Sequence, residues 1–372
     1  MAQAITRRGF IGLAGAGMGA ALLTACSGGQ DATTDTEATS GGADASEAVA
    51  DTATTGGIDY MALVNKQHKL PDDWESTVEL VEEKSLLYDD PVKVERKAYE
   101  AWKALKEELA AEGTYVELDS CYRSVAHQQE IMDEFTEKYG AEYAKRIVAT
   151  PGYSEHHTGL ALDLFLVIDG ENVAENEDMM KHPEVWEKVH AKLADHGFIL
   201  RYLHERKIFT GYSYEPWHIR YIDDPAVAAQ IMDEGLTFEE YLNEVQPFVA
   251  GCQVAYGESD MYEESDIDTT IDVILAEFGS WDGCVMQRFA YAGDDACGPD
   301  ELAYVNELRE SKEPDAEEFG QAIVIVTDFH SPDAAKAEGT AWEPDKDYEG
   351  YTWHLGRKDA DDAWHLMTWG YA

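Results

Sequence analysis

The stretch SEHHTGLALDLFL, residues 154–166, combines two histidines, a glycine and one aspartate with a run that is otherwise apolar. A short apolar run of this kind is typical of a buried strand. Asp163 stands in the middle of the run, seven residues after His156. A buried carboxylate is unfavourable unless it is paired or bound to a cation. The stretch therefore predicts a buried strand whose aspartate is paired or bound to a cation.

A second stretch, YEPWHIRY at residues 214–221, supplies groups of the same kind. His218 lies in a predicted strand, and Glu215 precedes it by three residues. Zinc binds imidazole nitrogen and carboxylate oxygen, and two histidines with one carboxylate leave a fourth tetrahedral position open for water. Zinc lowers the pKa of that water to about 7, and a nearby glutamate can accept its proton. We therefore predict a Zn2+ site at His156, Asp163 and His218, with Glu215 as the general base.

Both stretches also match the motifs of a known family. The first fits S-x-H-x-x-G-x-A-x-D at every fixed position, and EPWH fits E-x-W-H. Together they resemble the LAS zinc peptidases, which include D-alanyl-D-alanine carboxypeptidases of the vancomycin-resistance type. The resemblance runs from about residue 63 to residue 221 and does not reach the C-terminal part. The fixed positions of the first motif are Ser154, His156, Gly159, Ala161 and Asp163.

The resemblance implies roles for the matching residues. It assigns zinc to His156, Asp163 and His218, and general-base catalysis to Glu215. The family also has a Y-R-S segment, here within CYRSVAHQQ at residues 121–129.

In that segment the resemblance implies that Arg123 binds substrate and stabilises the transition state, with Gln128 on the helix that follows. A guanidinium suits the terminal carboxylate of a peptide because it donates two parallel hydrogen bonds. We expect Ser154 to orient the substrate or the loop that carries His156.

The function implied by the resemblance is a zinc-dependent D,D-carboxypeptidase, a hydrolase that removes the terminal D-Ala from peptidoglycan stem peptides. Two alternatives stay open. Members with the same metal set include D-Ala-D-Ala dipeptidases and L,D-endopeptidases. A different class would be a cell-wall binding lipoprotein that keeps the fold and has lost turnover.

The first 26 residues are predicted to be an export signal. Arg7 and Arg8 precede the short apolar run IGLAGAGMGAALLTA, which is typical of a signal peptide, and the paired arginines resemble a twin-arginine signal. LTAC, ending at Cys26, resembles a bacterial lipobox, which implies lipidation of Cys26 and anchoring at the outer face of the cytoplasmic membrane. The alternative is a plain secretory signal cleaved near Ala25. Residues 27–57 are small, polar and acidic, a composition that predicts a disordered tether.

The remaining sequence predicts an α+β protein in two domains. Residues 58–250 are expected to form the zinc-peptidase domain, a small antiparallel sheet flanked by helices. Residues 251–265 are polar and acidic and are predicted to be a linker, followed by a smaller α+β domain at 266–372. A helix before a curved antiparallel sheet in this second domain resembles nuclear-transport-factor-like domains. Its aromatic-rich end, residues 351–371, predicts sheet core, with a glycan-binding row as the alternative.

Charge and cysteine content limit the partners. The chain has 28 Lys and Arg against 75 Asp and Glu, a formal net charge of -47, so we exclude nucleic acid as a partner. Outside the cytoplasm cysteines can pair, and Cys284 with Cys297 is the first candidate, with free buried thiols as the alternative.

Overall fold

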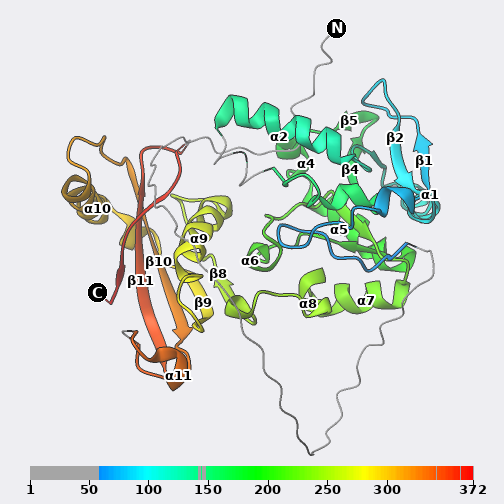
Figure 1. Cartoon of the computed structure of the whole chain (residues 1–372). Coiled ribbons are helices and arrows are strands. Elements are labelled where there is room, and N and C mark those ends of the chain that lie inside the picture. The colour runs from blue at the N-terminus through cyan, green and yellow to red at the C-terminus, as the bar shows by residue number, and fades with distance from the viewer. Residues whose placement is uncertain (1–57, 141–143, 145–147, 341, 361, 372) are drawn as a thin grey trace, which may run out of the picture.

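The structure is a computed structural model that describes residues 58–371 except 141–143, 145–147, 341 and 361 (Figure 1). The predicted export signal, Cys26 and the predicted tether lie outside the described residues. Within the described residues, no helix combines the length and apolar character needed to cross a membrane.

The first half of the described chain is built on an antiparallel sheet in the order β3-β4-β7-β6, with β5 beside β4 and a separate β1-β2 pair. Its strands are β1 Leu80–Glu83, β2 Val92–Glu95, β3 Val116–Leu118, β4 Ala161–Ile168, β5 Glu171–Val173, β6 Phe198–Leu200 and β7 His218–Tyr221. Its α-helices are α1 Arg96–Ala111, α2 Val125–Tyr139, α4 Asn176–Met179, α5 Pro183–Leu193, α6 Lys207–Thr210, α7 Pro225–Glu234 and α8 Phe238–Leu242. Short 3-10 turns are η1 Trp74–Ser76, η2 Glu155–Thr158, η3 Ala194–His196 and η4 Pro247–Val249.

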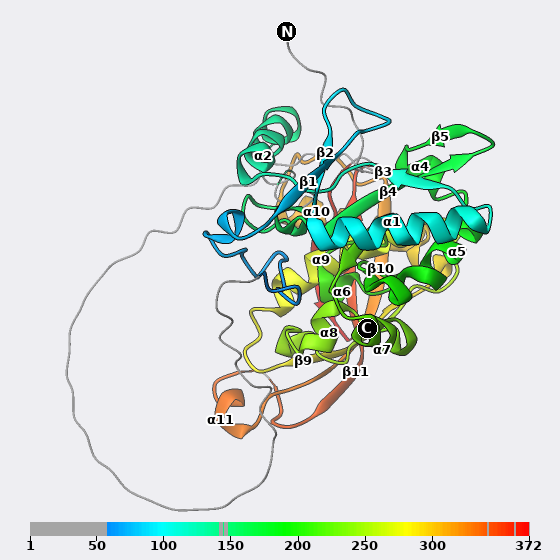
Figure 2. The same cartoon turned by 90° about the vertical axis from the view of Figure 1, so that its right-hand side faces the viewer.

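The two faces of this sheet differ in chemistry. Leu162 and Leu164 of β4 and Ile219 of β7 belong to one core cluster with residues of α1 and α5. Figure 2 shows α1 and α5 on the same side of the sheet. Side chains alternate along a strand, so Asp163 and His218 point to the opposite face. This alternation explains how an apolar strand carries a carboxylate: its leucines build the core, and its aspartate faces the other way.

The second half forms a five-stranded sheet in the order β12-β11-β10-β9-β8, antiparallel except for the parallel pair β8 and β9. Its strands are β8 Gln253–Ala255, β9 Val285–Tyr291, β10 Gln321–His330, β11 Asp347–Arg357 and β12 His365–Gly370. Its helices are α9 Glu264–Phe278, α10 Pro299–Lys312 and α11 Ala334–Ala337, with the 3-10 turn η5 Asp294–Cys297. Helices α9 and α10 lie on opposite faces of the sheet (Figure 1) and pack into separate apolar clusters.

The mixed helix and strand architecture confirms the predicted α+β class. The aromatic-rich end predicted as sheet core lies in β11 and β12, which pair antiparallel. Strand β8 lies inside the segment predicted as a linker and forms one edge of the C-terminal sheet. The four cysteines of the described residues are buried and free, so the expected pairing of Cys284 with Cys297 is wrong and the thiol alternative holds.

Candidate active site

The sheet register brings the central residues of the two motifs together. Strands β4 and β7 run antiparallel, and their register places Asp163 directly opposite His218. His156 lies in the 3-10 turn η2, immediately before β4. Gly159 ends that turn at φ 73, a left-handed conformation that favours glycine, and the chain then enters β4. The turn returns His156 to the face of the sheet on which Asp163 lies.

The three side chains present donor atoms to one point. Nε2 of His156 lies 3.2 Å from Oδ2 of Asp163, and Nδ1 of His218 lies 2.8 Å from Oδ1. One donor atom of each residue lies within 4.8 Å of the others, and all three residues are largely shielded from solvent. Oδ1 of Asp163 is buried and accepts no well-directed hydrogen bond within the described part of the chain. Two imidazoles and a carboxylate with an unsatisfied oxygen fit a zinc ion.

The electrostatics of this pocket favour positive charge between the donors. Burial by itself lowers the pKa of His218, but the carboxylates of Asp163 and Glu155 outweigh it and raise that pKa to about 10. Burial likewise opposes ionisation of Asp163, and the rings of His156 and His218 outweigh it and hold its pKa well below the usual range. The carboxylate is therefore ionised, and a cation in contact with it would be stabilised.

Contacts behind the imidazole rings fix which nitrogen points into the pocket. Nδ1 of His156 lies 2.7 Å from the carbonyl oxygen of Cys121, and a carbonyl only accepts, so Nδ1 carries the proton and Nε2 is the free donor atom. Nε2 of His218 lies 3.1 Å from Oε2 of Glu155, which leaves Nδ1 for the pocket. Carbonyls and carboxylates that hold the outer nitrogen are typical of metal-binding histidines.

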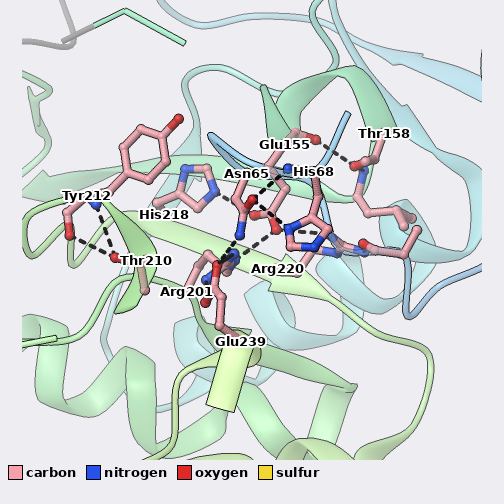
Figure 3. Close-up of polar contacts among 12 residues, drawn as sticks. Asn65, His68, Glu155, Thr158, Arg201, Thr210, Tyr212, His218, Arg220 and Glu239 are labelled. Carbon is pink, nitrogen blue, oxygen red and sulfur yellow. Dashed lines mark hydrogen bonds and ion pairs between the residues drawn. The ribbon is translucent and has the colours of Figure 1, made fainter. Parts of the chain in front are cut away.

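Glu155 is the centre of a buried charge cluster (Figure 3). Nε of Arg201 and Nη1 of Arg220 each lie 2.8 Å from its Oε1. Arg201 also donates to both carboxylate oxygens of Glu239, at 2.8 and 2.6 Å, and Asn65 donates to Glu239 at 3.0 Å. Burial opposes ionisation of Glu155, and the two guanidinium groups outweigh it and hold its pKa well below the usual range. His218 is thus oriented by a carboxylate that is itself held in place.

Glu215 lies beside the donor set, at the end of the loop that leads into β7. Its Oε2 is 3.8 Å from Nδ1 of His218. Burial raises the pKa of Glu215 to about 7, with a further rise from Asp163 that the charges of His218 and Arg123 oppose. A carboxyl group with a pKa near neutrality can both accept and release a proton at working pH, which is what general acid–base catalysis requires.

The remaining predicted residues lie around His156. Arg123 donates from Nη1 to Oε1 of Gln128 at 2.9 Å and from Nη2 to Oγ of Ser120 at 3.2 Å. Its backbone N–H donates to the carbonyl of His156 at 3.1 Å, and its charge acts on Asp163 and Glu215. Ser154 is buried just before η2. The structure therefore brings all the predicted residues of the described chain into one neighbourhood.

His157, next to the proposed metal donor His156, is buried. Its Nδ1 lies 2.7 Å from the carbonyl of Arg123, and its Nε2 accepts from the backbone N–H of Gly152 at 3.1 Å. It therefore joins the segment before η2 to the backbone of Arg123.

Sequence reasoning missed the supporting cluster of Glu155, Arg201, Arg220 and Glu239. Position 155 is a variable position of the motif, so the pattern does not single it out. A signal was present in the other strands: ILRY and HIRY each place an arginine in an apolar run. A buried arginine needs an anionic partner, just as a buried aspartate needs a cation.

The part of the chain that holds this site is similar to known proteins. The family profile described as VanY, D-alanyl-D-alanine carboxypeptidase, matches residues 91–224. The putative carboxypeptidase YodJ of Bacillus subtilis is 34% identical over 189 residues, which cover 50% of this chain and 68% of that protein. The bifunctional D-Ala-D-Ala dipeptidase and carboxypeptidase VanXYC of Enterococcus gallinarum is 30% identical, over 50% of this chain and 94% of its own length.

A solved structure of the vancomycin-resistance D,D-pentapeptidase VanY in complex with Zn(II) is 32% identical. It matches with a TM-score of 0.42, over 50% of this chain and 100% of that one. The chain belongs to the VanY family of D-alanyl-D-alanine carboxypeptidases, a class of peptide hydrolases. The predicted family is confirmed, and the family match ends before the C-terminal sheet.

Proposed function

We propose that this protein is a zinc-dependent D-alanyl-D-alanine carboxypeptidase that removes the terminal D-Ala from peptidoglycan stem peptides. One observation carries the proposal: the donor atoms of His156, Asp163 and His218 lie close together, and Oε2 of Glu215 lies 3.8 Å from the pocket nitrogen of His218. The family membership and the zinc complex of a similar protein support the same assignment.

In this mechanism the zinc would be held by Nε2 of His156, the carboxylate of Asp163 and Nδ1 of His218. When bound, zinc supplies Lewis-acid chemistry, because it polarises a carbonyl oxygen and lowers the pKa of water. Glu215 accepts the proton of the attacking water at its carboxylate and returns it to the amine of the leaving D-Ala. Glu155 accepts the Nε2–H of His218, so the proton that would have to leave on metal binding is the one on Nδ1.

Arg123 would bind the substrate. Gln128 and Ser120 hold its two terminal nitrogens, so the guanidinium is fixed before a ligand arrives. Gln128 is itself anchored, because its Nε2 donates to the carbonyl of Ala149 at 2.8 Å. A fixed guanidinium close to Glu215 suits the terminal carboxylate of a peptide and counteracts the repulsion expected from a strongly acidic protein. We further propose that Ser154 orients the substrate or the turn η2.

The test is release of D-Ala from a synthetic peptide that ends in D-Ala-D-Ala, with the purified full chain and zinc analysis of the same sample. We expect Glu215→Gln to lower kcat by about 10²–10⁴-fold while the zinc content stays unchanged, since Glu215 is not a metal ligand. Glu107→Gln on the exposed side of α1 is the matched control and should behave as wild type. Undiminished activity of Glu215→Gln, or activity that survives complete chelation, would contradict the mechanism.

A second substrate class has specific support. VanXYC is named as both a dipeptidase and a carboxypeptidase, and it is similar over almost its whole length. We therefore propose comparison of D-Ala-D-Ala, a pentapeptide and a cross-linked muropeptide at equal concentration. Preference for the pentapeptide supports the carboxypeptidase, preference for the dipeptide supports the alternative, and preference for the muropeptide supports an endopeptidase.

The cellular location is also part of the proposal. The sequence LTAC after a basic start and an apolar run supports export and lipid attachment at Cys26, and the twin arginines support export in folded form. The protein would then act in the cell envelope, at the outer face of the cytoplasmic membrane. Radiolabelled palmitate should label the wild-type chain, and Cys26→Ser should abolish the label and release the protein from membranes.

A further inference from the structure

Helix α9 of the C-terminal domain carries three carboxylates at intervals of four residues, Glu264, Asp268 and Asp272. Residues four apart lie on one face of a helix, so the three form an acidic stripe. Another face of α9 packs into the apolar cluster of the C-terminal sheet through Ile267, Ile271, Ile274 and Phe278. The stripe is therefore held rigidly by the core of its own domain.

The stripe faces the catalytic domain, and each of its carboxylates has a partner there. Oδ2 of Asp268 accepts a hydrogen bond from Oγ of Ser213 at 3.1 Å. Oδ2 of Asp272 lies 2.9 Å from Nζ of Lys207, and a carboxylate oxygen of Glu264 lies 3.5 Å from Nδ1 of His204. Figure 1 shows α9 beside α6, to which Lys207 belongs. All three partners precede Glu215 by 2 to 11 residues.

The middle of this contact is buried. Asp268 is 6% exposed, and its other carboxylate oxygen accepts the hydroxyl of Tyr256. Ile208 of α6 packs against the apolar cluster of the C-terminal domain. Hydrogen bonds to a buried carboxylate are stronger than those at an exposed surface, and a lost one leaves a buried group unsatisfied. The contact between α9 and the catalytic domain therefore contains a buried hydrogen bond, and its loss would cost stability.

The loop at residues 211–216 is held from two sides. On the catalytic side, the backbone N–H of Glu215 donates to the carbonyl of Tyr202 at 3.3 Å, and Nε2 of His190 lies 2.9 Å from the carbonyl of Pro216. On the side of α9, Asp268 accepts a hydrogen bond from Ser213. The ring of Tyr214 stacks, with centroids 3.5 Å apart, on His204, which is itself paired with Glu264 of α9. The contacts from α9 therefore lie two residues from the side chain that acts as base.

We propose that α9 positions a loop of the active site. Asp268 acts as a positioning residue: through Ser213 it holds the loop so that Glu215 faces the metal donors. The inference rests on the proposed function for the role of Glu215. It gives the C-terminal domain a task that the family match, which ends at residue 224, does not cover. The polar contacts of α9 with the described catalytic residues are to His204, Lys207 and Ser213, none of which is a proposed zinc donor, so loss of the contact should change catalysis and leave metal binding intact.

The test uses full-chain variants with peptide substrate. Misplacement of a reacting group by about 1 Å can reduce the rate by about 10²-fold, so we expect Asp268→Asn and Ser213→Ala each to lower kcat at least tenfold with KM and zinc content near wild type. The double variant should be no slower than the slower single variant, because both break one contact. Ser213→Thr keeps the hydroxyl and should retain kcat. Glu277→Gln, in the last turn of the same helix, is the charge-matched control and should match wild type.

Amide hydrogen exchange of residues 211–217 provides a readout that does not depend on turnover. Faster exchange in Asp268→Asn than in Glu277→Gln, together with the fall in kcat, supports the proposal. Wild-type kcat or unchanged exchange in both Asp268→Asn and Ser213→Ala would overturn it. If wild-type protein releases no D-Ala, the proposed function fails, and the exchange data alone then decide whether α9 positions the loop.

Discussion

Glu155 has the most connected position of the residues that surround the metal donors. It is 1% exposed, accepts from two guanidinium groups and holds the outer nitrogen of His218. The carboxylate of Glu155 therefore has two roles. It neutralises arginines that the strands carry into the interior, and it selects the tautomer that leaves Nδ1 of His218 free for a metal.

The first prediction is that Glu155→Gln weakens both the fold and the metal site. The amide has the same shape and no charge, so Arg201 and Arg220 lose their shared anion. Loss of one partner of a buried pair typically lowers the free energy of unfolding by about 3–5 kcal/mol, and loss of a contact behind a metal-binding histidine lowers metal affinity by about 10–100-fold. Urea unfolding and zinc titration measure the two effects. An outcome equal to that of the exposed control Glu107→Gln in both assays would contradict this role.

The second prediction concerns Gly159, where η2 turns into β4. A Cβ there would lie 3.0 Å from Cδ2 of Leu80 and 3.4 Å from the backbone nitrogen of Glu95, in addition to the strain of φ +73. Gly113 has φ +81, and a Cβ added there would meet nothing within 4 Å, so it isolates the backbone strain alone. We expect about 1–2 kcal/mol of destabilisation for Gly113→Ala and clearly more for Gly159→Ala. If the two substitutions lower the free energy of unfolding equally, the crowding around a Cβ at position 159 has no energetic cost.

The sequence predicted the proposed metal donors and the proposed base but missed the residues that hold them. His156, Asp163, His218 and Glu215 could be identified because the chemistry demands those side chains at fixed spacing. Glu155 depends on which arginines the folded sheet brings against it. That arrangement comes from a strand register formed over 55 residues of sequence, which no local pattern encodes.

At the scale of elements, local signals located the segments better than their ends. The apolar spacing of residues 92–113, which includes Val94, fits a single helix. The structure places Val94 in β2, where it pairs with Val81, and begins α1 at Arg96. The reason is a cap: the carboxylate of Glu95 accepts from the backbone N–H groups of Lys97 and Ala98, which ends the strand and starts the helix. Val94 is buried in both arrangements, so hydrophobic spacing alone could not separate them.

The third prediction concerns pH and the pairing of β10 with β11. His330 stands opposite Asp347 in the register, with Nδ1 2.8 Å from Oδ1 of Asp347 and Nε2 3.1 Å from Oδ1 of Asp345. The hydrogen bond to Asp347 raises the pKa of His330 and outweighs the opposing effect of burial, and Asp345 raises the pKa further. Because the folded pKa exceeds the unfolded value of about 6.5, the stabilisation is fully present below pH 6.5 and is lost as pH rises through the folded pKa.

We therefore expect His330→Gln to lower the Tm at pH 5.5 and to have almost no effect at pH 9, with a small effect overall because the site is exposed. Differential scanning calorimetry at the two pH values measures this difference. In a background that carries Asp345→Asn and Asp347→Asn, the same substitution should lose its pH dependence. A Tm difference that is independent of pH in the native background would contradict the ion pair.

At the scale of the whole molecule, the proposed metal site brings together distant parts of the chain. Its donors come from η2, β4 and β7, and their supporting contacts reach Asn65 and α8. Binding of an ion to the folded state alone adds stability in proportion to the logarithm of its free concentration. Zinc should accordingly influence the unfolding of the catalytic domain as well as its chemistry.

The fourth prediction is that chelation lowers the thermal stability of the full chain. At free zinc about a thousandfold above its Kd, removal of the ion should lower the free energy of unfolding by about 4 kcal/mol. Calorimetry with and without chelator measures the shift. Asp163→Asn keeps the shape of the side chain and loses the anion, so its Tm should no longer respond to zinc. A wild-type Tm that is insensitive to the chelator would contradict a resident metal at these donors.

The organisation of the whole molecule could be predicted only in part. The composition of the sequence separated the two folded regions. It did not predict that β8 pairs in parallel with β9 in the C-terminal sheet, because the three residues of β8 carry no signal for that pairing. The likeness to nuclear-transport-factor-like domains stays a prediction. The acidic stripe of α9 is visible in the sequence as spacing, yet its partners around Ser213 follow from domain packing, which the spacing does not determine.

The pairing of Asp163 with His218 also limits how this gene can change in length. Successive side chains of β4 point to opposite faces, so one codon gained or lost between Leu160 and Asp163 would turn the carboxylate into the core while the strand kept its apolar composition. The turn at residues 169–170 lies beyond the paired positions and could be lengthened without moving the aspartate. Tolerance of insertions and deletions should thus change abruptly within a few residues along the same hairpin.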